Sequence, residues 1–231
     1  YPGDLKFEDI SGPNGEPDGI INEYDRTNIG SPLPKFTFGL NNTFNYKNID
    51  LTVFINGSYG NKVLNYMSRN LNNMESLWNN QLSVVTERAR LQQVNESFAY
   101  PRTNSTGATV YNWFDDIDNV RVANPNATIP RAIQNDPNDN TRLSDRYIED
   151  GSYLRVKNIV LGYNFDKKLV RKLHLETLRV YANVQNLVTL TKYSGFDPEI
   201  GVSTASVNVY GLDNGRYPSP QIYSFGLNLS F

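Results

Sequence analysis

Strict alternation of apolar and polar residues is the feature that most restricts what this chain of 231 residues can fold into. Apolar side chains recur at every second position over most of residues 35–46 and 49–58, and the pattern returns over residues 178–190 and 223–231. A period of two places all the apolar side chains on one face of an extended strand. The polar pair Lys47-Asn48 joins the first two segments and indicates a tight hairpin turn. The sequence therefore predicts an all-β, antiparallel fold.

A further segment, residues 153–165, alternates with one interruption. Leu154 and Val156 occupy one phase of the pattern, whereas Ile159 occupies the other. One extra residue near Lys157-Asn158, a β-bulge, would return both halves to the same face. We therefore expect about five strands in total.

Strands of this kind occur both in soluble β-sandwiches and in membrane barrels. The polar faces here carry Asn, Thr, Ser and Gly with few Lys or Glu, which favours a water-filled lumen. The connections alternate between short, at Lys47-Asn48 and 166–176, and long, at 60–145 and 192–217, which is the layout of an outer-membrane barrel. Aromatic residues flank the apolar faces beside the short turns, where an interfacial girdle lies: Phe44, Tyr46, Tyr163 and Phe165.

Composition excludes several other classes of protein. The mean hydropathy is -0.52 and no run approaches the ~18 apolar residues of a spanning helix, so a helical membrane protein is excluded. A net charge of -2 without a basic stripe argues against a nucleic-acid partner. The chain has no cysteine, which removes thiol catalysis, cysteine-bound zinc and disulfides.

Three motifs carry a family resemblance. They are the segment 25–39, the run Asp-Arg-Tyr-Ile-Glu-Asp-Gly-Ser-Tyr-Leu-Arg at 145–155, and the terminal Phe-Gly-Leu-Asn-Leu-Ser-Phe at 225–231. With them, nearly the whole chain resembles the C-terminal portion of the SusC/RagA-type TonB-linked outer-membrane transporters of the Bacteroidetes. The fold that the resemblance implies is the last strands, about five, of a large antiparallel transmembrane β-barrel with long extracellular loops.

The resemblance also implies a function. Such proteins import glycans or peptides across the outer membrane of a Gram-negative bacterium, with a SusD-like surface lipoprotein as a lid. Energy comes through TonB, which contacts the N-terminal part of the family's proteins, absent here. The rest of the same barrel would be a further partner. The residues that match the family's C-terminal assembly signal are Tyr223, Phe225, Leu227, Leu229 and Phe231.

If Phe231 faces the periplasm, as that signal implies, counting back assigns a side to every connection. Five strands are an odd number and fewer than the ~8 of the smallest barrels, and unpaired edges are not tolerated in lipid. We therefore expect this chain to be a slice of a larger barrel, cut at Tyr1. Its expected parts are an extracellular loop (1–34), a barrel hairpin (35–59), a long and partly helical extracellular loop (60–145), a second hairpin (146–191), an extracellular loop (192–216) and the C-terminal strand (217–231).

The first loop contains a segment that fits most positions of an EF-hand calcium loop. Oxygen-bearing side chains recur at the required spacing, and Gly19 stands where the loop must turn sharply. The departures are Asn at position 1, Glu at position 3, Pro17 and the short final carboxylate. The alternative is an ordinary turn rich in Asp, Asn and Gly. The calcium interpretation predicts one structural Ca²⁺ and no organic cofactor, with the ligands Asn14, Glu16, Asp18, Ile20, Asn22 and Asp25.

The loop 60–145 opens with apolar residues at helical spacing, which predicts an amphipathic helix over about 62–90. That helix would either dock the lipoprotein or line the substrate path, or else pack on its own loops. The aromatic residues of the extracellular loops would stack on sugar rings or equally pack the loops against one another. The candidate substrate or partner contacts are Trp78, Tyr111, Trp113, Phe114, Tyr193 and Phe196.

No catalytic constellation is present, so we do not expect an enzyme. Three carboxylates, Asp115, Asp116 and Asp118, lie beside Trp113, but acids this close in sequence are typical of a solvated turn. His174 is the only histidine, with no Ser or Cys beside it to build a triad. The alternative to a transporter segment is a secreted all-β carbohydrate-binding module with a structural calcium site.

Overall fold

The computed structural model describes residues 1–76, 78–172, 174–200 and 209–231. The chain divides into two compact units. One, here called the loop unit, comprises Tyr1–Asn28 and Ser68–Ser144; the other, the wall unit, comprises Ile29–Met67 and Asp145–Phe231. Part of the expected loop 192–216, residues 201–208, lies outside the described residues.

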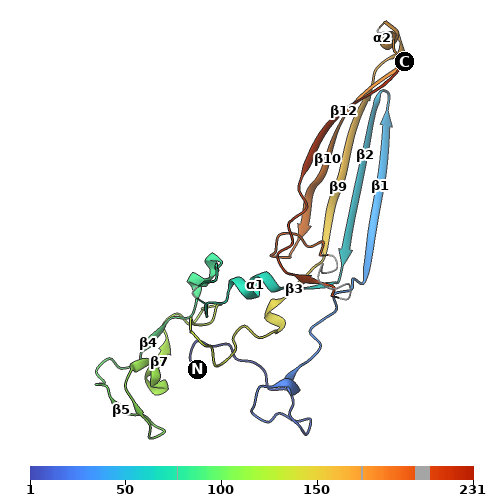
Figure 1. Cartoon of the computed structure of the whole chain (residues 1–231). Helices are drawn as coiled ribbons and strands as arrows, with labels where there is room; N and C mark the ends of the chain where they lie inside the picture. The colour runs from blue at the N-terminus through green and yellow to red at the C-terminus, as the bar shows by residue number, and fades with distance from the viewer. Residues whose placement is uncertain (77, 173, 201–208) are drawn as a thin grey trace. The chain divides into compact units, whose positions relative to one another are not determined.

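The wall unit is built on one five-stranded antiparallel sheet in the order β1-β2-β9-β10-β12 (Figure 1). The predicted all-β fold class with antiparallel pairing is therefore confirmed. β1 and β2 pair over their whole length, from Phe36 opposite Tyr59 to Tyr46 opposite Ile49. The bounds are Phe36–Tyr46 for β1, Ile49–Tyr59 for β2, Tyr153–Asn164 for β9, Thr177–Thr191 for β10 and Ile222–Ser230 for β12.

A bulge interrupts β9 at the predicted place. Against β2, Val156 lies opposite Ile55 and Asn158 lies opposite Phe54, so Lys157 is an extra residue between them. Because side chains alternate strictly along a strand, this one residue keeps the apolar side chains on both sides of the bulge on the same face.

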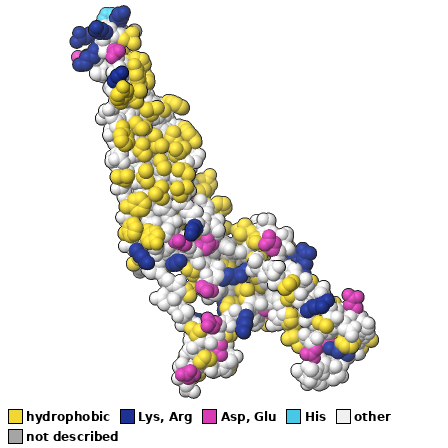
Figure 2. Space-filling view, turned by 180° about the vertical axis from the view of Figure 1, so that it is seen from behind, with side chains coloured by type: hydrophobic (Ala, Val, Ile, Leu, Met, Phe, Trp, Pro, Cys, Tyr) yellow, Lys and Arg dark blue, Asp and Glu magenta, His cyan; other side chains and the backbone are white. Residues whose placement is uncertain are grey.

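The two faces of the sheet differ in chemistry. One face is apolar, and several of its large side chains are more than half accessible, as for Leu40, Phe44 and Leu190. Figure 2 shows apolar side chains covering this sheet along its length. The other face is polar: the Thr43 and Thr52 hydroxyls lie 3.2 Å apart, and Arg179 pairs with Asp50 across the sheet.

A smaller three-stranded sheet, β11-β3-β8, lies at one end of the large sheet, and α2 (Lys167–Lys172) lies at the other (Figure 1). Val63, Tyr147 and Tyr193 are buried at the small-sheet end, and Val170 is buried at the α2 end. The small sheet and the 3-10 helix before it span Lys62–Asn65 (β3), Asp145–Tyr147 (η5), Ile148–Asp150 (β8) and Leu212–Asp213 (β11).

The described residues of the loop unit form only short elements around a small apolar core. Its buried apolar side chains are Val85, Ala89, Val110, Val120 and Ile129. The strands are β4 (Leu91–Gln93) with β7 (Val120–Val122), and β5 (Arg102–Thr103) with β6 (Thr109–Val110). The 3-10 helices are η1 (Glu23–Asp25), η2 (Ser83–Glu87), η3 (Trp113–Asp115) and η4 (Ile117–Asn119).

The long amphipathic helix expected over about 62–90 does not form. Its first residues are β3, a six-residue helix α1 follows at Tyr66–Leu71, and only η2 appears later. Asparagine explains the break: Asn72 donates from its side chain to the Ser68 hydroxyl, and Asn73 accepts from the backbone N–H of Glu75. Such local bonds compete with helical backbone bonds.

Among the described residues, none of the helices has the length and apolar composition needed to cross a membrane.

Candidate functional site

Arg155 of β9 fixes the segment that follows β10 to the large sheet, at the end beside the small sheet. Its guanidinium donates to Asp197 Oδ1 at 2.5 Å, to Glu199 Oε2 at 2.7 Å and to Thr189 Oγ1 at 2.7 Å. Lys157, the bulge residue, donates to the same oxygen of Glu199 at 3.0 Å. The bulge therefore places a second cation beside Arg155.

Asp197 is the centre of this cluster and is 5% exposed. Burial by itself raises the pKa of its carboxyl group, but the backbone N–H groups of Ser219 and Glu199 and the Arg155 guanidinium outweigh burial and lower that pKa to about 2. The carboxylate is therefore charged at neutral pH. It connects the start of the segment after β10, at Glu199, and its end, at Ser219, to Arg155 of the sheet.

A second cluster joins the same segment to the small sheet. Tyr193 donates its hydroxyl to Asp213 Oδ2 at 2.5 Å, and both residues are buried. Burial, followed by the hydrogen bond to Asp213, raises the pKa of this hydroxyl. Glu149 of β8 accepts from the backbone N–H and the hydroxyl of Ser194 and from the Asn65 amide, at 2.7–2.8 Å. The two clusters make a hydrogen-bonded polar rim at this end of the wall unit.

Tyr193 corrects one expectation of the sequence analysis. It was expected to contact a substrate or partner, but it is 5% exposed and its hydroxyl is used by Asp213. The ring is buried beside the small sheet, and a buried tyrosine hydroxyl needs a hydrogen-bond partner, which Asp213 of β11 provides. Tyr193 therefore positions the rim.

The other predicted contact residues are on the surface of their own units. In the wall unit, Phe196 is 72% exposed, directly before the buried Asp197. In the loop unit, Trp78 is almost fully exposed and Tyr111 is 68% exposed. Trp113 and Phe114 are in edge contact, with ring centroids 6.1 Å apart, so these two rings pack on each other.

The three clustered acids of the loop unit bind their own loop. Asp116 is fully buried and pairs with Arg102, whose pKa the hydrogen bond to Asp116 raises. Asp118 accepts from the Ser105 backbone N–H at 2.8 Å, and Asp115 accepts from the Asn112 side chain. Each of the three acids is therefore bonded within its own loop.

The EF-hand-like segment is also held by its own backbone. Asp25 accepts three backbone N–H groups, from Ile10, Ser11 and Asn22, at 2.8–3.2 Å. The bond from Asn22 is the first cause that lowers the pKa of Asp25. Asp18 accepts from Ile20, and Asn22 accepts from Tyr24 in a capping box. In the part of the chain that the structure describes, no three His, Cys, Asp or Glu side chains gather to hold a metal ion. The structure does not bring Glu16 and Asp18 together with Asp25, and Asn14 and Glu16 lie on the surface.

The remaining predicted residues lie at the α2 end and along β12. His174 follows α2 with a positive φ of 59° and is exposed. The five residues expected to form the assembly signal share the apolar face, with exposed fractions from 49% for Leu229 to 94% for Phe231.

Sequence reasoning missed the Arg155 cluster. Its acids belong to the Phe-Asp-Pro-Glu stretch that ends at Glu199, in a loop with no periodicity, and Asp197 is 42 positions from Arg155. The available signal was an Arg and a Lys on the otherwise uncharged polar face of residues 153–165. Two lone cations on such a face indicate acidic partners elsewhere in the chain.

Comparisons with known proteins show which proteins this chain is similar to. No family model matches the chain. It is 34% identical, over its full length, to TonB-dependent receptor P3 of Formosa agariphila, and 30% identical over 99% of its length to TonB-dependent receptor P26 of the same organism. Ninety of its residues are 37% identical to TonB-dependent receptor SusC of Bacteroides thetaiotaomicron, which is 38% of the chain and 8% of that receptor. The chain spans about a fifth of the length of receptors P3 and P26, at 19% and 20%.

Solved structures show the same fold. The RagAB peptide importer in its closed-closed state matches 95% of this chain with a TM-score of 0.63 and 20% identity, over 20% of the matched chain. A structure of the RagAB peptide transporter matches 87% of this chain with a TM-score of 0.57 and 21% identity, over 18% of the matched chain.

Proposed function

Because the chain is related along its whole length to TonB-dependent receptors of the SusC/RagA type, we propose that it forms part of the wall and extracellular mouth of an outer-membrane importer. TonB-dependent receptors are outer-membrane β-barrel proteins. The observation that carries the proposal is the five-stranded antiparallel sheet with one apolar, exposed face and one polar face.

The two faces support a membrane position for this sheet. Exposed Phe, Leu and Ile side chains along a whole sheet are unfavourable in water and favourable against lipid tails. The polar face would then line the barrel interior. β9 and β10 have 12 and 15 residues, more than the ~9–11 needed to cross, so the rim built on Arg155 would stand outside the hydrocarbon.

The edge strands β1 and β12 each pair on one side within the described sheet. In lipid, every backbone N–H and C=O needs a partner. We therefore propose that further strands of the same receptor continue the sheet beyond both edges.

The family resemblance supports a proposal for the cargo and the partners. The structural neighbour is named a peptide importer, and the sequence resemblance implies import of glycans or peptides with a SusD-like lipoprotein as a lid and TonB as the energy source. The loop unit and the rim would face the outside and meet substrate and lid. The relatives' names favour this transporter role over a secreted carbohydrate-binding module and over an enzyme.

The test is a chromosomal variant of the full receptor in which residues 70–142 are replaced by a short Gly-Ser linker. Uptake of the receptor's cargo and co-purification of its lipoprotein should be lost, while the barrel still shows heat-modifiable migration on gels. Normal uptake by this variant would contradict the assignment of the loop unit to the mouth. A receptor missing from the outer membrane in the unmodified strain would contradict the proposal as a whole.

A further inference from the structure

α2 is a short basic helix at the end of the wall unit opposite the small sheet. Four of its six residues are basic and all four are exposed; Figure 2 shows Lys and Arg side chains gathered at this tip. In the described part of the chain, none of them forms an ion pair. They are Lys167, Lys168, Arg171 and Lys172.

The acids near α2 do not neutralise this cluster. Asp166 precedes the helix and Glu176 follows it, two acids against four basic residues. Asp166 accepts from the Asn48 side chain at 2.9 Å, and among the described residues neither acid forms an ion pair with α2. The tip therefore keeps an excess of positive charge that faces solvent.

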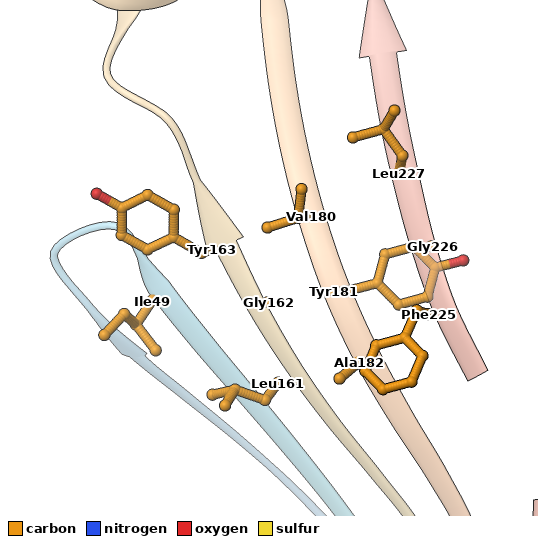
Figure 3. A pocket seen from close by; sticks show the side chains of 10 residues that line it. All are labelled: Ile49, Leu161, Gly162, Tyr163, Val180, Tyr181, Ala182, Phe225, Gly226 and Leu227. Carbon is orange, nitrogen blue, oxygen red and sulfur yellow. The ribbon is translucent and has the colours of Figure 1, made fainter. Parts of the chain in front are cut away.

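An apolar hollow of about 690 Å³ lies in the sheet at the same end (Figure 3). Ala182 of β10 stands between Leu161 of β9 and Phe225 of β12 in one cross-strand row, and its small side chain leaves the space between them. The next row toward α2 holds Tyr163, Val180 and Leu227. The hollow is a shallow depression that is open on its outer side, and its lining is almost entirely apolar, which suits an acyl chain lying along the surface.

We infer that α2 and this hollow together bind one anionic phospholipid of the surrounding membrane. Its phosphate would meet the basic side chains of α2, and one acyl chain would lie against Ala182 between Leu161 and Phe225. The inference rests on the proposed membrane position of the sheet, which puts the apolar face in lipid and α2 at the interface.

Two observations point to a lipid. Basic residues beside a membrane segment attract anionic headgroups, roughly fivefold in affinity for each residue near the surface. A free phosphate would use α2 but not the hollow, and an apolar solute would use the hollow but not α2. A phospholipid is the ligand whose charge and chain match both.

The experiment is native mass spectrometry of the full receptor in detergent, titrated with phosphatidylglycerol or phosphatidylcholine of identical acyl chains. The unmodified receptor should bind one phosphatidylglycerol at least about tenfold more tightly than phosphatidylcholine, because two basic residues near the surface already contribute more than that. Replacing the four basic residues of α2 by Gln should weaken phosphatidylglycerol about tenfold or more and leave phosphatidylcholine unchanged. Ala182→Phe, which fills the hollow, should weaken both lipids alike.

Matched controls test whether any loss of positive charge, or any bulky substitution on this face, has the same effect on lipid binding. Gln in place of four exposed basic residues outside α2 (Arg26, Lys35, Lys192 and Arg216) should leave binding unchanged. Val184→Phe changes the next outward residue of β10, outside the hollow, and should also have no effect. Ala182→Leu is the milder variant if Phe impairs folding, which heat-modifiable migration reports.

Equal affinity for the two lipids in the unmodified receptor would overturn the inference, as would a lipid preference that survives loss of the α2 charges. Unchanged binding in both Ala182 variants would overturn the role of the hollow. Concentration-dependent dimers that vanish in Ala182→Phe would assign this face to a second copy instead. A receptor that inserts correctly but shows no preference refutes only this inference; a receptor that never enters the outer membrane refutes the proposed function.

Discussion

Arg155 of β9 and Asp197 of the loop after β10 form an ion pair at 2.5 Å in which both side chains are almost fully buried. Removing one partner of a buried pair leaves the other charge uncompensated, at a cost of roughly 3–5 kcal/mol. We predict that Asp197→Asn lowers the stability of the loop 192–216 by about 3 kcal/mol. The rate of tryptic cleavage at Lys192 and Arg216 should then rise roughly a hundredfold. Mass spectrometry of the fragments measures this rate. Phe196→Ala, at a side chain 72% exposed, is the control and should cleave like the unmodified receptor.

The same pair predicts a pH dependence. The pKa of Asp197 is about 2, below the ~3.9 of an unfolded Asp, so its contribution to stability is complete above about pH 4 and is lost as the pH falls through 2. Pepsin, which works at both values, should cut this loop slowly at pH 4 and rapidly at pH 2. In Asp197→Asn the loop should be cut rapidly at both. Equal cleavage of the unmodified loop at the two pH values would argue against a stabilising role for the Asp197 carboxylate.

The bulge at Lys157 sets the register of β9. Deleting this one residue should send Leu154 and Val156 to the polar face and abolish assembly, because a shift of one residue exchanges the two faces of a strand. Lys157→Ser keeps the extra residue and should assemble, losing only the contact with Glu199. Heat-modifiable migration in outer-membrane fractions measures assembly. Normal assembly of the deletion variant would show that the bulge is dispensable.

Tyr181 lies between two glycines on neighbouring strands, opposite Gly162 and Gly226. A Cβ built on Gly226 overlaps the Tyr181 ring. Gly226→Ala should therefore cost about 1–3 kcal/mol, seen as a lower urea midpoint in detergent. Tyr181→Ala should restore part of that loss in the double variant, since the two residues are in contact. Ser224→Ala, on the same face of β12, should change little; a loss equal to that of Gly226→Ala would refute the steric explanation.

The segment 9–25 is held by hydrogen bonds to Asp25. Asp25→Ala should open it and raise its cleavage by protease, whereas Glu16→Ala, at an exposed side chain, should not. Chelation of divalent cations should leave cleavage unchanged in both variants. Protection that disappears on chelation and returns with calcium would instead support the EF-hand interpretation.

The alternation of apolar and polar side chains was enough to predict the antiparallel sheet of the wall unit. The phase of the alternation and the one break in it predicted the sheet and the bulge at Lys157. An apolar environment on one face of a strand requires an apolar residue at every second position. Loops obey no such rule. The stretch after β3 has helical spacing of apolar residues, yet side chains such as Asn72 and Asn73 end the helix by local hydrogen bonds. The contact of Arg155 with Asp197 depends on how a loop returns to its sheet, which no local pattern records.

The central claim, that one face of this sheet meets lipid and the other the barrel interior, is tested most directly by spin labels along β10. The chain contains no cysteine, so single cysteines can be introduced at positions 179–184 of the full receptor. Collision with oxygen, which is enriched in lipid, should peak at Val180, Ala182 and Val184 and fall at Arg179, Tyr181 and Asn183. The polar nickel reagent should show the reverse order wherever it can enter the lumen. Oxygen accessibility without a period of two, or with the opposite phase, would contradict the account.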